Sequence, residues 1–253
     1  MKKELEQYLL HLADTTLVLA QRNGEWCSHG PILEQDIAIT NITLDLIGQA
    51  RLFYQYAASI IGNTTEDELA YNRDEKAFSN LLLVEIENGD WAQTILRQYL
   101  FSQYQLLLFT ELKNHEEKEL AAIAEKSIKE TTYHVRWSKD WVLRLGDGTE
   151  ESKTRLTNAL KSIWPYTDEM FKPASYEKFT NIDWNKLQQD WKSKCMETFS
   201  ESTLLTDASI SSLLQDNTIQ MFTGGKQGNH TAALAPLLAE LQSVQRAYPN
   251  SSW

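Results

Sequence analysis

Glycine, proline and cysteine are scarce in this chain of 253 residues, and each scarcity narrows the class of protein. With 10 glycines and 5 prolines, the chain has few residues that end regular elements, so we expect long ones. The two cysteines, Cys27 and Cys195, lie far apart and fit neither a metal-binding motif nor a disulfide framework. A chain without a disulfide framework suits a reducing compartment, and we expect a cytoplasmic protein.

Long apolar runs and an excess of positive charge are missing as well. The N-terminal segment has lysines followed by leucines, but acidic side chains interrupt it, which indicates an amphipathic helix and not a signal peptide. No apolar run reaches the ~20 residues of a membrane span, so we expect no membrane association. The formal net charge is -11, and no basic patch is visible, which argues against nucleic acid as a partner.

Helical periodicity is what the sequence does have. The apolar spacing predicts four long helices, over residues 4–22, about 33–61, 91–115 and about 117–145. Gly62 is a plausible C-cap of the second helix, and Asp90 is a good N-cap of the third. The third helix is apolar nearly all round, so we expect it to be central and buried.

Further helices are predicted downstream, and no strand pattern bounded by hairpin turns is visible. They cover residues 149–171, 183–200 and 230–247, the last beginning at Asn229 or Thr231. Four long helices in succession predict an all-α, ferritin-like four-helix bundle. We therefore predict one domain over residues 1–253, with a core bundle at about 4–147 and flanking helices at about 149–253.

Several polar residues fall inside these apolar helices, as they do in ferritin-like di-iron proteins. Such a site takes one carboxylate from each of two helices and a Glu-x-x-His motif from each of the other two. The candidate positions here are Asp14, Asp45, Gln105, Thr131 and His134. Each of the last three helices lacks at least one ligand, because Gly48 replaces a histidine and Gln105 and Thr131 replace carboxylates.

The incomplete ligand set indicates a degenerate metal site. Glu130 does not restore it, since it lies about 100° round the helix from Thr131. Neutral glutamine and threonine side chains cannot balance the charge of two iron ions. Three interpretations stay open: a buried hydrogen-bond network that fixes the helix register, a single weakly bound metal, and a working di-iron site.

Five short segments carry a resemblance to a known family. They are GEWC at 24–27, LDLIGQAR at 44–51, FSNLLLVE at 78–85, IKE with YH at 128–134, and TGGK at 223–226. In this order and spacing they resemble the non-catalytic ferritin-like subunit of the phenylacetyl-CoA (ring 1,2-) epoxidase of phenylacetate degradation. The resemblance covers nearly the whole chain and is weakest at about 172–190.

The resemblance implies a structural subunit of a multicomponent monooxygenase. In that enzyme a homologous catalytic subunit holds a di-iron centre and inserts one oxygen atom of O2 into the ring of phenylacetyl-CoA. A reductase with flavin and an iron–sulfur cluster supplies electrons from NADPH. This chain would hold no cofactor and no catalytic residue. It would form a heteromer with the catalytic subunit, stabilise it and help to bind the CoA thioester; self-association is a further expectation.

The resemblance also implies contacts with the CoA thioester in two segments. These contain Ala77, Phe78, Ser79 and Asn80, and Glu177, Lys178, Phe179 and Thr180. From the residues alone, Ser79 and Asn80 can equally cap a helix, and Phe78 can pack a loop. The glycine-rich turn GGKQGNH at 224–230 can contact a phosphate or be purely structural.

Two other functions stay open at this stage. The chain can be a stand-alone di-iron oxidase, which requires bound iron despite the missing ligands. It can also be a helical binding module unrelated to CoA chemistry.

Overall fold

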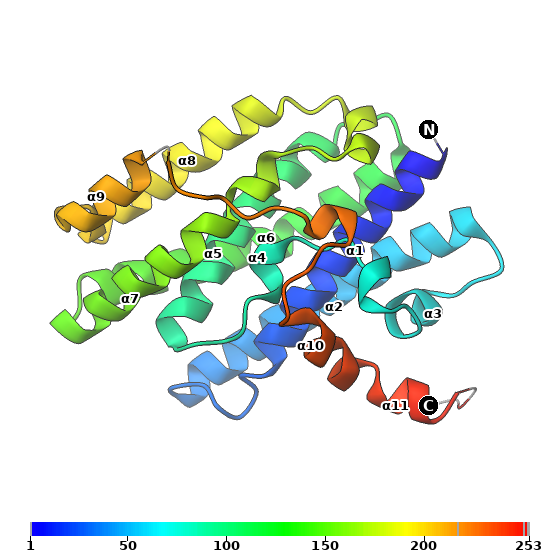
Figure 1. The fold of residues 1–253 in the computed structure, drawn as a ribbon, viewed down its shortest axis with the longest axis horizontal. Coiled ribbons are helices and arrows are strands. Elements are labelled where there is room, and N and C mark those ends of the chain that lie inside the picture. The colour runs from blue at the N-terminus through cyan, green and yellow to red at the C-terminus, as the bar shows by residue number, and fades with distance from the viewer. Residues whose placement is uncertain (1, 217, 250, 252–253) are drawn as a thin grey trace. The chain divides into compact units, whose positions relative to one another are not determined.

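The computed structural model describes residues 2–216, 218–249 and 251, and these residues form helices and no strand. The predicted all-α class is therefore confirmed. The α-helices, shown in Figure 1, are α1 (Lys2–Gly24), α2 (Leu33–Ile61), α3 (Glu66–Tyr71), α4 (Leu82–Glu85), α5 (Trp91–Leu112), α6 (Lys118–Gly146), α7 (Glu150–Ile163), α8 (Trp184–Glu201), α9 (Ala208–Gln215), α10 (Leu234–Leu241) and α11 (Ser243–Ala247). Six short 3₁₀ turns, η1 (Glu75–Ala77), η2 (Trp164–Tyr166), η3 (Asp168–Phe171), η4 (Ser175–Thr180), η5 (Leu204–Thr206) and η6 (Gly225–Gln227), lie among them.

The chain divides into two compact units. The first contains residues 1–87, 174–179 and 223–253, and the second contains residues 88–173 and 180–222. The four-helix bundle over residues 4–147 and the single domain over 1–253 therefore stay predictions.

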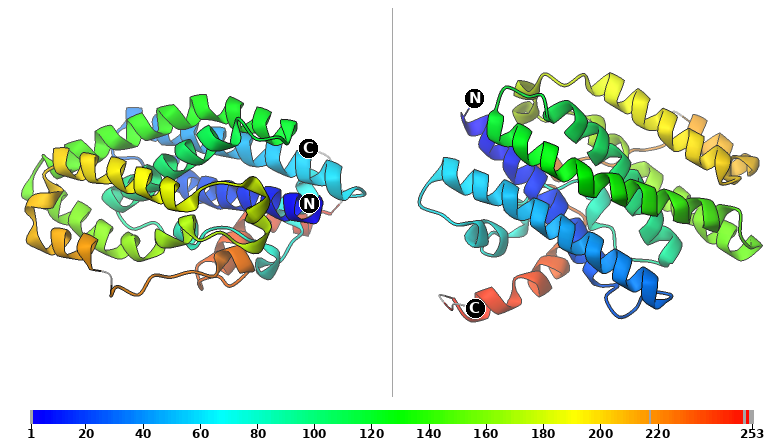
Figure 2. Two further views of the ribbon diagram at one scale, coloured as in Figure 1. Left: turned by 90° about the horizontal axis from the view of Figure 1, so that it is seen from above. Right: turned by 180° about the vertical axis from the view of Figure 1, so that it is seen from behind.

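The first unit is built on the long helices α1 and α2, which run side by side (Figure 2). The wide apolar face of α1, with Leu9 and Leu19 fully buried, packs on the face of α2 that carries Ile42 and Phe53. Gly62 ends α2 with a positive φ of 75°, which confirms the predicted C-cap. The short helices α3, α4, α10 and α11 complete this unit.

The second unit is built on α5 and α6, with α7 and α8 packed against them. Asp90 caps α5, since its Oδ1 accepts a hydrogen bond of 3.0 Å from the backbone N–H of Gln93. Most of α5 is buried, as its apolar composition predicts. The indole of Trp191 on α8 donates a hydrogen bond of 2.9 Å to the carbonyl of Leu100, which fixes α8 on α5.

Two predicted helices are wrong in their extent. The helix predicted over 149–171 ends at Ile163 and continues as 3₁₀ turns, because Pro165 has no backbone N–H to donate. The helix predicted over 230–247 begins at Leu234 and breaks at Gln242. Its N-cap is Ala233 and not Asn229 or Thr231, because the backbone N–H of Thr231 donates to the carboxylate of Glu85.

The connection at 63–90 holds more structure than its sequence suggests. It contains α3, whose capping box joins Thr65 and Glu68, and also η1 and α4. In the part of the chain that the structure describes, no helix combines the length and the apolar character needed to cross a membrane.

Candidate functional site

The loop at 77–81 is held along α1 by three polar side chains of that helix. Asp14 Oδ2 accepts a hydrogen bond of 2.9 Å from the backbone N–H of Ser79, and His11 Nδ1 lies 2.6 Å from the carbonyl oxygen of Ser79. One turn further, Thr15 Oγ1 accepts from the N–H of Leu81 at 3.2 Å. His11 and Asp14 are three residues apart, so the helix presents both on one face. This face of α1 fixes the backbone of the loop.

Asp14 is fully buried, and both of its oxygens are engaged inside the first unit. The hydroxyl of Tyr54 donates to Oδ1 at 2.6 Å, and the guanidinium of Arg73 forms an ion pair with the carboxylate. Burial raises the pKa of Tyr54, and the negative charge of Asp14 raises it further. Burial lowers the pKa of Arg73, but the charges of Asp14 and Tyr54 and the hydrogen bonds to both together outweigh this, so the pKa rises overall. The ion pair compensates the buried charge.

A second buried ion pair joins η4 to the glycine-rich turn. Lys226 Nζ lies 2.8 Å from Glu177 Oε2 and 3.1 Å from Oε1, and both side chains are almost completely buried. Glu177 Oε2 also accepts from the backbone N–H of Ala174 at 2.6 Å. His11 Nε2 lies 4.0 Å from Glu177 Oε1. His11 therefore stands between Ser79 and Glu177, one residue from each of the two segments expected to contact the CoA thioester.

The glycine-rich turn covers the other side of the loop. A Cβ atom on Gly225 would lie 2.2 Å from the carbonyl oxygen of Asn80, so only glycine permits this close approach. His230 Nε2 lies 2.9 Å from the carbonyl oxygen of Phe78, and its Nδ1 lies 3.6 Å from Glu85. The ammonium of Lys226 is buried and paired with Glu177. These contacts support the structural interpretation of the turn over the phosphate interpretation.

The predicted CoA contacts differ sharply in their exposure. Ala77 and Lys178 are exposed, and Ser79 and Phe179 are half-buried. The other four are buried: Phe78, Asn80, Glu177 and, in the second unit, Thr180. Ser79 and Asn80 do not cap a helix, because the N-cap position of α4 is Leu81 and has no side-chain cap. Phe78 packs inside, as the alternative interpretation of this residue predicted.

The remaining positions of the degenerate metal site are placed as follows. In the second unit, Gln105 on α5 and Thr131 on α6 are both buried, and the Thr131 hydroxyl lies 3.4 Å from Gln105 Oε1. His134 is buried on α6, and Asp45 is half-buried on α2.

The donor set does not fit a metal ion. Across the described residues, no three histidine, cysteine, aspartate or glutamate side chains are grouped in a way that could hold one. Asp14 already has a guanidinium against its carboxylate, and a cation at the same oxygens would be repelled by it.

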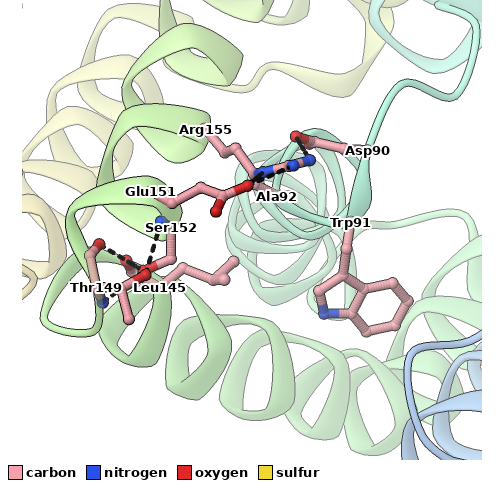
Figure 3. Close-up of a pocket in the computed structure, with 8 residues that line it drawn as sticks. All are labelled: Asp90, Trp91, Ala92, Leu145, Thr149, Glu151, Ser152 and Arg155. Carbon is pink, nitrogen blue, oxygen red and sulfur yellow. Dashed lines mark hydrogen bonds and ion pairs between the residues drawn. The ribbon is translucent and has the colours of Figure 1, made fainter.

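A separate pocket of about 190 Å³ lies in the second unit, where α5 and α7 begin (Figure 3). Arg155 lies at this pocket and pairs with Glu151 at 2.6 Å and with Asp90 at 3.3 Å. Thr149 and Ser152 form the capping box of α7. These polar groups therefore serve the ends of the two helices.

Sequence reasoning missed the groups that organise the first unit: His11, Tyr54, Arg73 and the pairing of Lys226 with Glu177. One signal was present, since His11 and Asp14 share a helix face that is otherwise apolar. The partners of the other groups lie far along the chain, 59 residues apart for Arg73 and Asp14, and no periodicity reveals such a pair.

Two long helical hairpins with polar groups buried along them define a ferritin-like, all-α class of protein. The whole chain, residues 1–253, matches the family described as "Phenylacetic acid catabolic protein", and the chain belongs to this family. It is 44% identical over 255 residues to the C component of the 1,2-phenylacetyl-CoA epoxidase of Escherichia coli (strain K12), with 99% of each chain covered. The resemblance inferred from the short segments is confirmed.

Proposed function

We propose that this chain is a structural subunit of a phenylacetyl-CoA 1,2-epoxidase and acts in phenylacetate catabolism. The observation that carries the proposal is its similarity, along almost the entire length of both chains, to a relative named as the C component of that enzyme. The chain is the partner of a catalytic subunit, whose fold it stabilises. The two free cysteines suit a cytoplasmic location.

The chain itself is non-catalytic in this proposal. Support comes from Asp14, whose carboxylate is neutralised by Arg73, and from the neutral pair of Gln105 and Thr131 where an iron site needs carboxylates. We assign the di-iron centre to the catalytic subunit, and flavin, the iron–sulfur cluster and NADPH to the reductase.

The contribution to CoA-thioester binding falls on the members of the two segments that are exposed or half-buried. The backbone at 77–81 is fixed by α1 and the glycine-rich turn, so Ala77 and Ser79 form a rigid edge. Lys178 is the exposed cation of the second segment and suits a phosphate group. The buried Phe78, Asn80 and Glu177 hold this surface in shape without touching the ligand.

Lys178→Ala tests this assignment in the assembled epoxidase. We expect the KM for phenylacetyl-CoA to rise by about tenfold or less with kcat unchanged, because a lost phosphate contact weakens ground-state and transition-state binding alike. Lys192→Ala, which changes an exposed lysine on α8, is the matched control. Equal KM values for both variants would contradict the assignment of Lys178 to the CoA-thioester site.

Co-expression tests the proposed function as a whole. A tagged copy of this chain is produced with the di-iron catalytic subunit of the same organism, and the eluted complex is analysed for mass and iron. We expect one stable heteromer whose iron follows the amount of catalytic subunit. Elution of this chain alone, or iron bound to this chain in isolation, would overturn the proposal. The second result would favour a stand-alone di-iron oxidase.

A further inference from the structure

An apolar stripe lies exposed along α2. Leu33 is 72% exposed, Ile37 51%, Leu44 60% and Ile47 43%. Their spacings of four, seven and three residues place them on one helix face, which extends about 21 Å along the axis. The residues of α2 that pack in the first unit, such as Ile42 and Leu46, lie on another face and are fully buried. The exposed stripe is therefore a second apolar face of the same helix.

Gly48 lies in this stripe, and no contact in its own chain requires a glycine at this position. It stands inside a 29-residue helix, where glycine is less stable than alanine. A Cβ atom built on Gly48 would meet nothing within 4 Å, whereas one on Gly225 would strike a backbone oxygen. A glycine that leaves space open suits the close approach of a second backbone.

We propose that this stripe, Leu33, Ile37, Leu44, Ile47 and Gly48, is the surface on which α2 receives a helix of another subunit. The two helices come closest at Gly48. The inference rests on the proposed function, since it requires a heteromeric complex, and it adds the location and chemistry of one contact.

The charges beside the stripe describe the partner helix. Glu34, Asp36 and Asp45 are the acidic residues of α2, and its one cation, Arg51, is paired with Glu66 at 3.5 Å. The matching helix has an apolar ridge flanked by lysine or arginine. Such complementarity steers association and fixes register more than it adds affinity.

A second copy of this chain fits the stripe poorly. In a two-fold pairing, residue i of one copy contacts j while j contacts i. A two-fold axis between Thr40 and Asn41 centres the stripe on itself, but it brings Glu34 close to Asp45 of the other copy, because these two acidic residues are 11 positions apart and so lie on the same flank of α2.

A two-fold axis at Gly48 avoids that repulsion, but the apolar residues of the stripe then no longer face apolar residues of the other copy. It sets Ile37 against Ser59 and Leu33 against Asn63 of the other copy. The charge pattern therefore favours a different subunit over self-association through this face.

The size of the stripe indicates a folded partner and not an isolated peptide. A surface about 21 Å long and one helix wide, about 10 Å, is well below the roughly 800 Å² per partner of a stable interface. The stripe is then the apolar centre of a wider contact between two folded chains.

Substitution of Gly48 tests the proposal, because it separates binding from folding. In the full chain, Gly48→Ala and Gly48→Leu leave the urea unfolding midpoint equal to or above that of the wild type, since the space is open and glycine is a poor helix former. Affinity for the purified di-iron catalytic subunit, measured by biolayer interferometry, falls in the order Gly, Ala, Leu. The leucine variant loses at least about tenfold. Lys192→Leu on α8 is the matched surface control and stays within about twofold of the wild type.

The outcomes of this experiment distinguish failure of the docking surface from failure of the proposed function. Wild-type binding that Gly48→Leu leaves unchanged overturns the docking surface and leaves the subunit role intact. No binding by the wild type overturns both. A wild-type homodimer that Gly48→Leu disrupts, seen by analytical ultracentrifugation, overturns the choice of partner.

Discussion

At the scale of single residues, the first unit depends on charges buried in pairs. Asp14→Asn keeps the shape of the side chain but leaves Arg73 without its counter-charge. We expect a loss of about 3–5 kcal/mol in the free energy of unfolding, as for other buried pairs broken from one side. Urea unfolding followed by circular dichroism measures it. Tyr54→Phe leaves the ion pair in place and removes the hydrogen bond to Asp14 and a longer one, of 3.3 Å, that Tyr54 accepts from Arg73, so it should cost about 1–2 kcal/mol. Equal losses for the two variants would contradict a role for the ion pair.

His230 makes stability depend on pH. Burial lowers its pKa, but the carboxylate of Glu85 at 3.6 Å, the contact with the Phe78 carbonyl and the charge of Asp14 together outweigh this, so the pKa in the folded chain is raised. A raised pKa means that the stabilisation is fully present below the ordinary histidine pKa of about 6.5. This stabilisation is lost as the pH rises through the pKa of His230 in the folded chain.

The stability difference between the wild type and His230→Gln should therefore shrink as the pH rises. Unfolding midpoints in urea, measured from about pH 5.5 to about pH 8.5, check this expectation. In the Glu85→Gln background the same difference should vary little with pH. A difference that grows with pH would show that the sign is wrong.

At the scale of elements, the Glu177–Lys226 pair joins η4 to the glycine-rich turn, and a double-mutant cycle tests it. Glu177→Gln or Lys226→Met alone leaves one buried charge unpaired and should cost about 3–5 kcal/mol, whereas the double variant should recover most of that loss. Urea unfolding of all four proteins gives the coupling energy. Additive losses would mean that the pair is not coupled. The exposed pair of Lys186 and Asp190 on α8 is the control and should show coupling below about 1 kcal/mol.

The long helices were the part of the structure that the sequence predicted best. The long helices were predictable because each has an apolar period and a clear end, as Asp90 and Gly62 show. The helix predicted over 149–171 failed because periodicity continues through Pro165 although α-helical hydrogen bonding does not. The one predicted over 230–247 failed because its first residues hydrogen-bond to other elements instead.

The candidate site was only partly predictable for a related reason. The resemblance selected the segments around Ser79 and Glu177, but not the side chains that join them. His11 and Ser79 are 68 residues apart, and Glu177 and Lys226 are 49 apart. Contacts between residues so far apart in the sequence depend on how the whole unit packs. A local pattern in the sequence cannot predict them.

At the scale of the whole molecule, a ferritin-like chain whose buried acid is neutralised by Arg73 suits support of a catalytic partner better than oxygen chemistry of its own. In the proposed roles, the exposed stripe on α2 faces another subunit and the edge at 77–79 faces the CoA thioester. Both surfaces lie on the first unit.

The most direct test of this account is the rate of phenylacetyl-CoA epoxidation by the iron-loaded catalytic subunit and its reductase, measured with and without this chain. The account predicts that activity appears only when this chain is present and saturates at a fixed ratio of the two subunits. Asp14→Leu, made together with Arg73→Met, should still support activity if it folds, since no metal is assigned to Asp14. Full activity of the catalytic subunit in the absence of this chain would contradict the central claim.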